Sequence, residues 1–284
     1  MRENSLVIDE IGVSGMIKDI VVNLSSEEMA TFAVSTASEF HAHLAGISFL
    51  YEPIVLPVSD MGGIPFDYIE AQRSENEKRA TDAKAQFNES ARCAGLSSES
   101  SMINAEVAEA GSIFGRIARR FDLAVVSQTG PDKRLADDLI IEAALFESGR
   151  PVLVVPYIQK AGLRLNRVML CWNGSSNAAR AASDAMPFLA KAKKVDVVTI
   201  IGEKGKDDEI AGADIAEHLA RHGLNIELRL TSAGHIDVAD NILSLAADIS
   251  ADLIVMGGYG HSRLREFVLG GATRGVLSSM TIPL

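Results

Sequence analysis

Short apolar segments alternate with longer amphipathic stretches along most of the chain. Val197–Ile201 is typical of the apolar segments, which are rich in Val and Ile and carry apolar side chains at successive positions. The run Ile242–Ile249 is typical of the amphipathic stretches, because its apolar side chains follow the i, i+3, i+4, i+7 spacing of a helix that packs on a sheet. The pattern predicts strands that alternate with helices. The expected strands are 16–23, 45–51, 102–108, 123–127, 152–156, 167–172, 195–201, 225–231 and 252–257, and the expected helices are 26–42, 67–94, 111–121, 134–148, 177–191, 208–222, 236–250 and 271–279.

The strands have the character of a parallel sheet. Apolar side chains on successive positions suit a strand that helices cover on both faces, and most consecutive strands are separated by a segment long enough for a helix. Such connections are right-handed crossovers. We therefore predict the α/β class, with doubly wound parallel sheets.

The chain also contains an internal repeat. Met16–Ser26 resembles Asn166–Ser176, because each is an apolar run that reaches an asparagine, Asn23 or Asn173, and continues with small polar residues suited to cap a helix. We expect these two asparagines to be equivalent. A repeat of this length predicts two copies of one fold.

A second pair of segments sets the extent of the two copies. Phe121–Ser127 mirrors Ala251–Gly257. We predict an N-terminal domain over 1–157 and a C-terminal domain over 166–284, and the 284 residues suit two domains at about 150 residues each. The connection 158–165 is short and polar, so we expect the domains to pack against each other.

The two halves end differently. The first closes with the apolar strand in Arg150–Pro156, whereas the second stops at Thr281–Leu284, so that most of the matching strand is missing. Two explanations remain open at this point. Either the native chain extends a few residues further, or another chain covers the open edge of the sheet, and a homodimer is one form of the second explanation.

Composition and charge exclude several classes of function. The net charge of −11 opposes nonspecific binding to nucleic acid or to anionic membranes. Apolar runs fall far short of the roughly 18 residues that a membrane span needs, and the N-terminus lacks the basic start and apolar core of a secretory signal. Cys93 and Cys171 are far apart and in no metal-binding or redox spacing. We expect a soluble, cytoplasmic protein.

Glycines gather beyond the last predicted strand. Gly257, Gly258 and Gly260 follow it, and Gly270 and Gly271 open the final helix. Ligands of open α/β sheets bind at the carboxyl ends of the strands, where glycines let backbone amides approach a phosphate and a helix N-terminus attracts its charge. A purely structural explanation stays open, because glycines also end strands and relieve close packing.

The spacing Gly-x2-Gly-x9-Gly after the segment Asp252–Gly257 resembles the ATP-binding signature of the universal stress protein (UspA) family. The resemblance covers roughly 16–284, and the chain is similar to the tandem-domain members. It implies two Rossmann-like domains, similar to those of the adenine nucleotide alpha hydrolases, in a stress-induced cytoplasmic protein. In members that bind ATP, an Asp ends the first strand, the second strand meets the adenine, and the glycines meet ribose and phosphates. Carried over to this sequence, the nucleotide-binding positions are Asn173, Ile200, Gly257, Gly260, His261, Gly270, Gly271, Ala272 and Thr273.

This sequence departs from the family pattern at two positions. Asn173 replaces the acid without its charge, and Gly271 removes the Ser or Thr hydroxyl that follows the last glycine. Thr273 lies in the same helical turn and is a candidate to supply that hydroxyl. Arg263 and Arg265 in the spacer would add positive charge beside the phosphates. Mg²⁺ is expected only together with ATP, and no other metal is expected.

The first half lacks the glycine signature. Its equivalent segment, Ser127–Asp132, contains one glycine, and Asp137 and Asp138 follow at the start of the next helix, where they would repel phosphate. We predict that this half is a degenerate copy that packs against the other one.

The histidines give weaker signals. His218 and His222 are four residues apart on one helix, a spacing that can hold zinc, but no third ligand lies nearby in the sequence. We interpret His222 as a residue at a helix C-terminus. His41 and His43 are expected at a surface or packing position, and His235 lies beside the expected nucleotide crevice.

The leading hypothesis is a stress-response module that binds an adenine nucleotide in its C-terminal half, where occupancy alters how the halves pack. A nucleotide-free scaffold that acts through protein contacts is the alternative. An ATP-hydrolysing or nucleotidyl-transfer enzyme is the weakest hypothesis, because no nucleophile elbow, phosphate-binding lysine loop or acid–base pair occurs in the sequence. We therefore predict no enzymatic activity beyond a slow ATPase.

Overall fold

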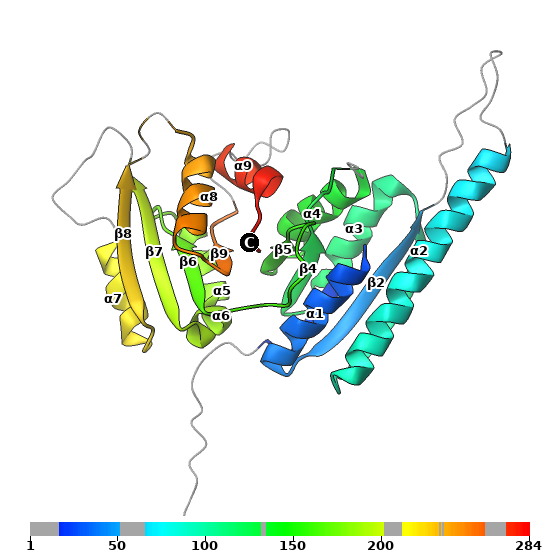
Figure 1. Cartoon of the computed structure of the whole chain (residues 1–284), viewed down its shortest axis with the longest axis horizontal. Coiled ribbons are helices and arrows are strands. Elements are labelled where there is room, and N and C mark those ends of the chain that lie inside the picture. Colours follow the sequence, from blue (N-terminus) through cyan, green and yellow to red (C-terminus); the bar gives the residue numbers. More distant parts are fainter. Residues whose placement is uncertain are drawn as a thin grey trace, which may run out of the picture.

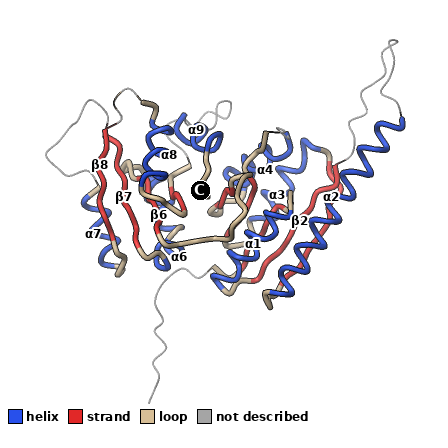
Figure 2. Tube along the Cα trace, viewed as in Figure 1, coloured by secondary structure: helices blue, strands red, loops and turns tan. Residues whose placement is uncertain are grey.

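The computed structural model describes residues 17–51, 66–131, 135–201, 212–232, 234, 236–258 and 271–284. Within these residues two β-sheets lie side by side, and helices flank both of them (Figure 1, Figure 2). Every described strand pair is parallel. The predicted α/β class with parallel sheets is confirmed.

The first half forms a five-stranded sheet with the strand order β3-β2-β1-β4-β5. Its strands are β1 (Asp19–Asn23), β2 (His43–Tyr51), β3 (Ser98–Ala105), β4 (Leu123–Ser127) and β5 (Val152–Val155), and its helices are α1 (Glu27–Phe40), α2 (Phe66–Cys93), α3 (Val107–Ala118) and α4 (Leu135–Glu147). The chain adds β2 and β3 on one side of β1 and then crosses to the other side for β4 and β5. This reversal creates a crevice at the carboxyl ends of β1 and β4.

The second half repeats the arrangement with the order β8-β7-β6-β9. Its strands are β6 (Arg167–Cys171), β7 (Lys194–Ile201), β8 (Ile226–Ser232) and β9 (Leu253–Val255), and its helices are α5 (Ser176–Asp184), α6 (Met186–Lys191), α7 (Ala213–Arg221), α8 (Val238–Asp248) and α9 (Gly271–Ser279). The reversal now lies between β6 and β9. The equivalent crevice therefore opens at their carboxyl ends, next to the start of α9.

The first helix of each half begins with a serine cap. The hydroxyl of Ser26 accepts a hydrogen bond from the N–H of Met29 at 3.3 Å, and the hydroxyl of Ser175 accepts one from the N–H of Ala178 at 3.2 Å. Each serine satisfies a backbone donor that has no partner within the helix. The small polar residues predicted to cap these helices do so.

Three predicted elements differ clearly from the structure. Helix α3 begins at Val107, four residues before the predicted start at 111, so that the strand predicted over 102–108 already ends at Ala105. The helix expected over 177–191 is interrupted at Ala185, which ends α5 and precedes α6. Pro187 explains the break, because proline lacks an N–H and its ring clashes with a carbonyl in the preceding turn. Strand β3 begins at Ser98, four residues before the predicted start, because its polar first half pairs with β2 at the edge of the sheet.

Each half contains an aspartate that makes the same pair of hydrogen bonds to the start of its first strand. One carboxylate oxygen of Asp122 accepts hydrogen bonds from two backbone N–H groups at the start of β1, at 2.9 and 3.1 Å. Asp252 makes the same pair of bonds at the start of β6, at 2.9 and 3.0 Å. These contacts make Asp19 and Arg167, the first residues of β1 and β6, equivalent.

This register corrects the predicted equivalence of Asn23 and Asn173. Asn23 is the last residue of β1 and is buried, and Cys171 occupies its place in β6. Asn173 lies two residues beyond the end of β6 and is exposed. The prediction was wrong because it paired the asparagines by residue type, whereas the strand register places Cys171 opposite Asn23. The loop before the capping serine is also one residue longer in the second half.

The two halves are in contact through their helices. The rings of Phe40 in α1 and Phe188 in α6 meet edge to face, with 4.9 Å between their centroids. In the connecting segment, the N–H of Leu163 donates to the hydroxyl of Ser35 at 3.1 Å. One cluster of buried apolar side chains contains residues of both halves. Burial of apolar surface between the halves therefore contributes to holding them together.

The last two residues join the edges of the two sheets. The N–H of Ile254 in β9 donates to the carbonyl of Pro283 at 2.9 Å, as the N–H of Ala124 in β4 does to Pro151 at 3.1 Å. Leu284 and Val154 exchange both of their backbone hydrogen bonds, at 2.7 and 3.0 Å, in the manner of an antiparallel pair. Backbone pairing therefore connects β9 to β5 of the other half.

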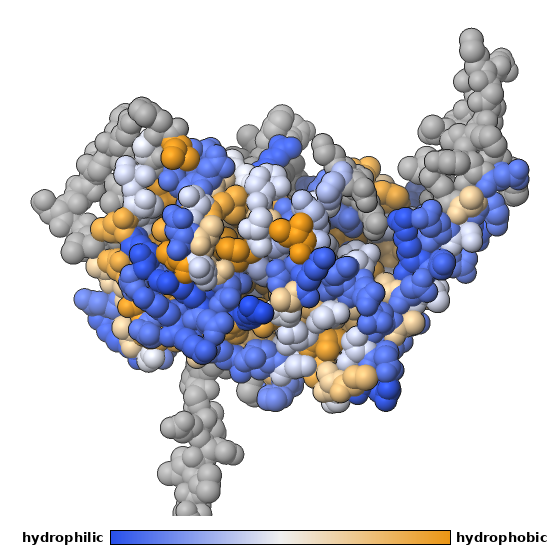
Figure 3. Space-filling model, viewed as in Figure 1, coloured by the Kyte–Doolittle hydropathy of each residue, from blue (hydrophilic) through white to orange (hydrophobic). Residues whose placement is uncertain are grey.

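The outer surface of α2 is polar. The space-filling view shows hydrophilic residues along the visible side of this helix (Figure 3), which fits its many charged residues. None of the helices that the structure describes combines the length and the apolar character needed to cross a membrane.

Candidate functional site

The carboxyl ends of β6, β7 and β9 surround a cavity of about 390 Å³. The first turns of α5, α8 and α9 complete its walls. A volume of this size lies within the range of about 300–1,000 Å³ that is typical of small-molecule sites. The residues that line it are Cys171, Trp172, Asn173, Ser175, Ala178, Val198, Ile200, Val238, Ile242, Met256, Gly257, Gly271, Ala272 and Thr273.

The structure brings together the predicted site residues that it describes. Those that line the cavity are Asn173, Ile200, Gly257, Gly271, Ala272 and Thr273. Gly260, His261 and Gly270 lie outside the described residues, as do His235 and the two spacer arginines.

The sequence-based prediction missed the α8 wall of the cavity. Val238 is 39% exposed and Ile242 is buried, and both line the cavity. The helical spacing of Ile242 placed it in the core, which is correct but incomplete, and Val238 was not singled out. The signal available in the sequence was the position of the helix start directly after a strand, because the carboxyl ends of parallel strands share one edge of the sheet.

The side chain of Asn173 makes a hydrogen bond within its own loop. Its side-chain oxygen accepts from the N–H of Ser175 at 3.1 Å, which shapes the turn that leads into α5. The resemblance noted in the sequence implies a carboxylate at this position, where the chain carries an amide. The oxygen of the amide therefore supports the loop in this chain, and the side chain carries no charge.

The two described glycines of the motif have different surroundings. A Cβ atom added at Gly257 would lie 2.8 Å from the backbone of Asn177 and Ala178, in the first turn of α5. A Cβ atom added at Gly271 would meet nothing within 4 Å. Close packing of β9 against α5 therefore requires glycine at 257, whereas glycine at 271 leaves open space at the start of α9.

The first turn of α9 faces the cavity. Gly271, Ala272 and Thr273 belong to this turn, and Thr273 is buried. The first backbone N–H groups of a helix have no acceptor within it and carry the positive end of the helix dipole. The turn therefore offers donors to an anionic group, and Thr273 adds a polar side chain to the same wall.

The side chains that line the described part of the cavity carry no formal charge. Burial raises the pKa of the Cys171 thiol to about 12, so the thiol stays protonated at neutral pH. No group of three or more metal-ligating side chains is found among the described residues. His218 and His222 lie on the exposed side of α7, with ring centroids 4.9 Å apart, and far from these walls in the fold.

The equivalent position in the first half is built differently. Because β4 and β9 pair with β1 and β6 in the same register, Ser127 and Gln128 take the places of Gly257 and Gly258. Gln128 is 4% exposed, which is rare for an amide side chain unless it is hydrogen-bonded.

Gln128 makes contacts on both sides of the junction between the halves. Its side-chain N–H donates to the carbonyl of Leu277 in α9 at 2.8 Å, and its oxygen accepts from the N–H of Tyr157 at 3.3 Å. The next residue, Thr129, donates to Asp138 within the first half at 2.5 Å. The loop that would surround a ligand in the first half is thus committed to protein contacts.

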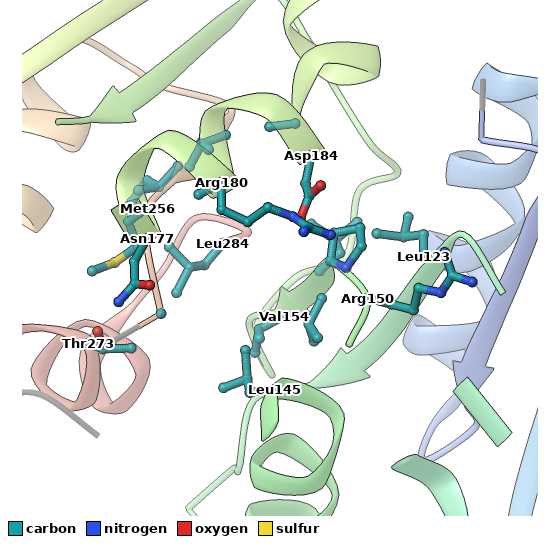
Figure 4. A pocket seen from close by; sticks show the side chains of 18 of the residues that line it. Leu123, Leu145, Arg150, Val154, Asn177, Arg180, Asp184, Met256, Thr273 and Leu284 are labelled. Carbon is teal, nitrogen blue, oxygen red and sulfur yellow. The ribbon is translucent and has the colours of Figure 1, made fainter. Parts of the chain in front are cut away.

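A second cavity, also of about 390 Å³, lies between the halves (Figure 4). Its walls come from β5 and α4 on one side and from α5, β9 and α9 on the other, and Arg180 and Asp184 form an ion pair at 2.7 Å on its α5 wall. Met256 and Thr273 line both cavities. The start of α9 therefore separates the candidate site from the junction.

Comparison with known proteins matches the second half to one family. Residues 165–284 match the model of the universal stress protein family. Universal stress protein Slr1230 from Synechocystis sp. (strain ATCC 27184 / PCC 6803 / Kazusa) is 28% identical over 174 residues, which cover 58% of this chain. The match spans 57% of that relative's length.

Solved structures extend the likeness to both halves. A universal stress protein from Archaeoglobus fulgidus DSM 4304 matches with a TM-score of 0.64 at 16% identity, over 93% of this chain and 94% of its own. A protein of unknown function from Pseudomonas aeruginosa PAO1 matches with a TM-score of 0.56 at 15% identity, over 94% of this chain and 91% of its own. At these identities the likeness establishes the fold.

Proposed function

We propose that this chain, whose residues 165–284 match the universal stress protein model, is a tandem member of that family and that its C-terminal half binds an adenine nucleotide, with ATP as the first candidate. Binding would serve a regulatory or protective role in the cytoplasm under stress. One observation carries the proposal: six positions predicted from the family resemblance line one cavity at the carboxyl ends of β6, β7 and β9.

The cavity walls suit the parts of such a ligand. Val198, Ile200 and Val238 supply apolar surface for a purine ring. The first turn of α9 supplies backbone N–H groups for phosphate oxygens, and Thr273 adds a hydroxyl. With no charged side chain among the described lining residues, the negative charge of the phosphates would be balanced by these N–H groups, by the helix dipole and by Mg²⁺ bound together with ATP.

Calorimetric titration with ATP tests the proposal, and Gly271→Asp is the informative variant. The added Cβ has open space, and a carboxylate in the first turn of a helix is favourable for the fold. The same carboxylate would repel phosphate, so we expect affinity for ATP to fall at least about tenfold while the protein stays folded. Ala108→Asp is the matched control, because it adds the same charge to the exposed first turn of α3 in the other half.

The result for the unaltered protein decides the proposal. Bound ATP at 100 times its dissociation constant should stabilise the fold by about 2.7 kcal/mol. No heat of binding and no thermal shift would refute it. Equal affinities of the unaltered protein and the Gly271→Asp variant would show that ATP binds elsewhere.

A nucleotide-free scaffold is the second candidate. Two observations favour it: Asn173 uses its side-chain oxygen within its own loop, and Gln128 ties the first half to α9. Mass spectrometry of small molecules released from the purified native protein separates the two candidates. Recovery of an adenine nucleotide in stoichiometric amount supports the binding module, and a protein without nucleotide that also fails the titration supports the scaffold.

A further inference from the structure

The side chain of Gln128 caps the C-terminal end of α9, a helix that belongs to the other half of the molecule. The last four carbonyl groups of a helix have no partner within it, and Leu277 lies in the last turn of α9. The side-chain N–H of Gln128 donates to the carbonyl of Leu277 at 2.8 Å, across 149 positions of sequence. The first half therefore supplies the cap for the C-terminal end of α9.

The opposite end of α9 forms a wall of the candidate nucleotide site. The helix has nine residues, so its two ends are about 13 Å apart and are joined by a continuous ladder of backbone hydrogen bonds. Thr273 lies one turn before Leu277 and lines the cavity. A displacement of α9 at its Gln128 end therefore also moves the N–H groups that face the ligand.

Gln128 differs from the residue at the corresponding position of the second half. In the second half the corresponding residue is Gly258, where an added Cβ would meet nothing within 4 Å. In the first half the long polar side chain is buried, and both ends of its amide are bonded, to Leu277 and to Tyr157. The half that lacks the glycine signature carries at that position a side chain that reaches the other half.

We propose that Gln128 is a positioning residue for the nucleotide site of the C-terminal half. It holds α9 in the place that the ligand requires, and the N-terminal half is thereby part of the binding device. This inference rests on the proposed function. Coupling between two contacts is reciprocal, so nucleotide binding also strengthens the contact between Gln128 and α9.

Gln128→Met tests the proposal by removing the amide while keeping the length of the side chain. A single hydrogen bond of this kind changes an equilibrium by about threefold to tenfold, so we expect ATP to bind to the variant weaker by that factor. Gln128→Leu is a second variant, because it removes both hydrogen bonds of the amide without adding a buried charge. Thr129→Val is the matched control, because it removes the neighbouring hydrogen bond to Asp138 and leaves α9 untouched.

Hydrogen exchange distinguishes a positioning role of Gln128 from a purely structural one. In the unaltered protein, ATP should slow exchange of the Tyr157 N–H, which belongs to the first half and donates to Gln128. In the Gln128→Met variant, saturating ATP should have no effect on that amide. Loss of this effect together with weaker binding supports the proposal.

Three outcomes would overturn it. Equal ATP affinity of the unaltered protein and both Gln128 variants would sink the inference and leave the proposed function standing. An equal loss of affinity in Thr129→Val would mean that general destabilisation of the first half weakens binding. Failure of the unaltered protein to bind ATP would refute the proposed function, and the role of Gln128 would fall with it.

Discussion

Replacing Gly257 by alanine tests whether this glycine serves the fold rather than the ligand. The added Cβ would lie 2.8 Å from backbone atoms of Asn177 and Ala178. Ordinary van der Waals contact begins at 3.4 Å, so β9 and the first turn of α5 must separate by about 0.6 Å, the difference between these distances. Overpacking of this kind costs about 1–3 kcal/mol, because backbone rather than a flexible side chain has to move.

Urea unfolding followed by circular dichroism measures this cost. Gly271→Ala is the matched comparison from the same motif: its Cβ meets nothing, and exchanging glycine for alanine in a helix stabilises by up to about 1 kcal/mol. We expect the unfolding midpoint to fall for Gly257→Ala and to stay or rise for Gly271→Ala. A midpoint for Gly257→Ala equal to that of the unaltered protein would refute the packing argument and return Gly257 to a role in ligand binding alone.

Two further predictions concern an ion network and the thiols. Burial raises the pKa of Asp196, but hydrogen bonds from Arg167 and Arg229, at 2.6 and 2.5 Å, outweigh burial and hold that pKa below its usual range. Asp196→Asn should therefore destabilise the fold by about 2–3 kcal/mol at neutral pH. Because the pKa of Asp196 is lower in the folded than in the unfolded chain, the difference should begin to shrink as the pH falls to the ordinary aspartate pKa of about 4, and it should vanish only below the lowered pKa of the folded protein; a difference that persists in stronger acid would contradict this account. Cys93 is exposed, and its thiol donates to the carboxylate of Glu89, which raises the pKa of Cys93. Burial raises the pKa of Cys171 to about 12, so a thiol reagent at pH 8 should label Cys93 of the native protein well before Cys171, and both in denaturant. Rapid labelling of both in the native protein would show that the Cys171 side of the cavity is open.

The local pattern of the sequence was sufficient to predict most of the elements. Alternation of apolar and amphipathic segments depends on neighbours in the chain, and α9 begins and ends where the pattern placed it, at Gly271 and Ser279. Predicted bounds were wrong where a single residue breaks a helix that the pattern supports, or where pairing with a neighbouring strand extends a strand beyond its apolar run. Pro187 breaks a helix that its apolar spacing otherwise supports, and β3 gains the polar residues from Ser98 onward because β2 offers them partners.

The motif predicted where the candidate site lies, but its glycines alone did not show what each does. Gly257 and Gly271 look alike in the sequence, and only the position of α5 distinguishes a glycine enforced by packing from one that leaves open space. The α8 wall, with Val238 and Ile242, was missed for the same reason. Distances between residues of different elements depend on how strands pair, and strand pairing is not a local property.

By itself, the sequence determined that this protein is two unequal copies of one α/β unit and that only the second carries the glycine motif. The tertiary structure decided how the copies correspond and what joins them. It showed that Cys171, and not Asn173, is equivalent to Asn23, because backbone register rather than residue type makes two positions equivalent. It also brought Gln128 to the end of α9, a contact between residues 149 positions apart that exists only because the halves pack together.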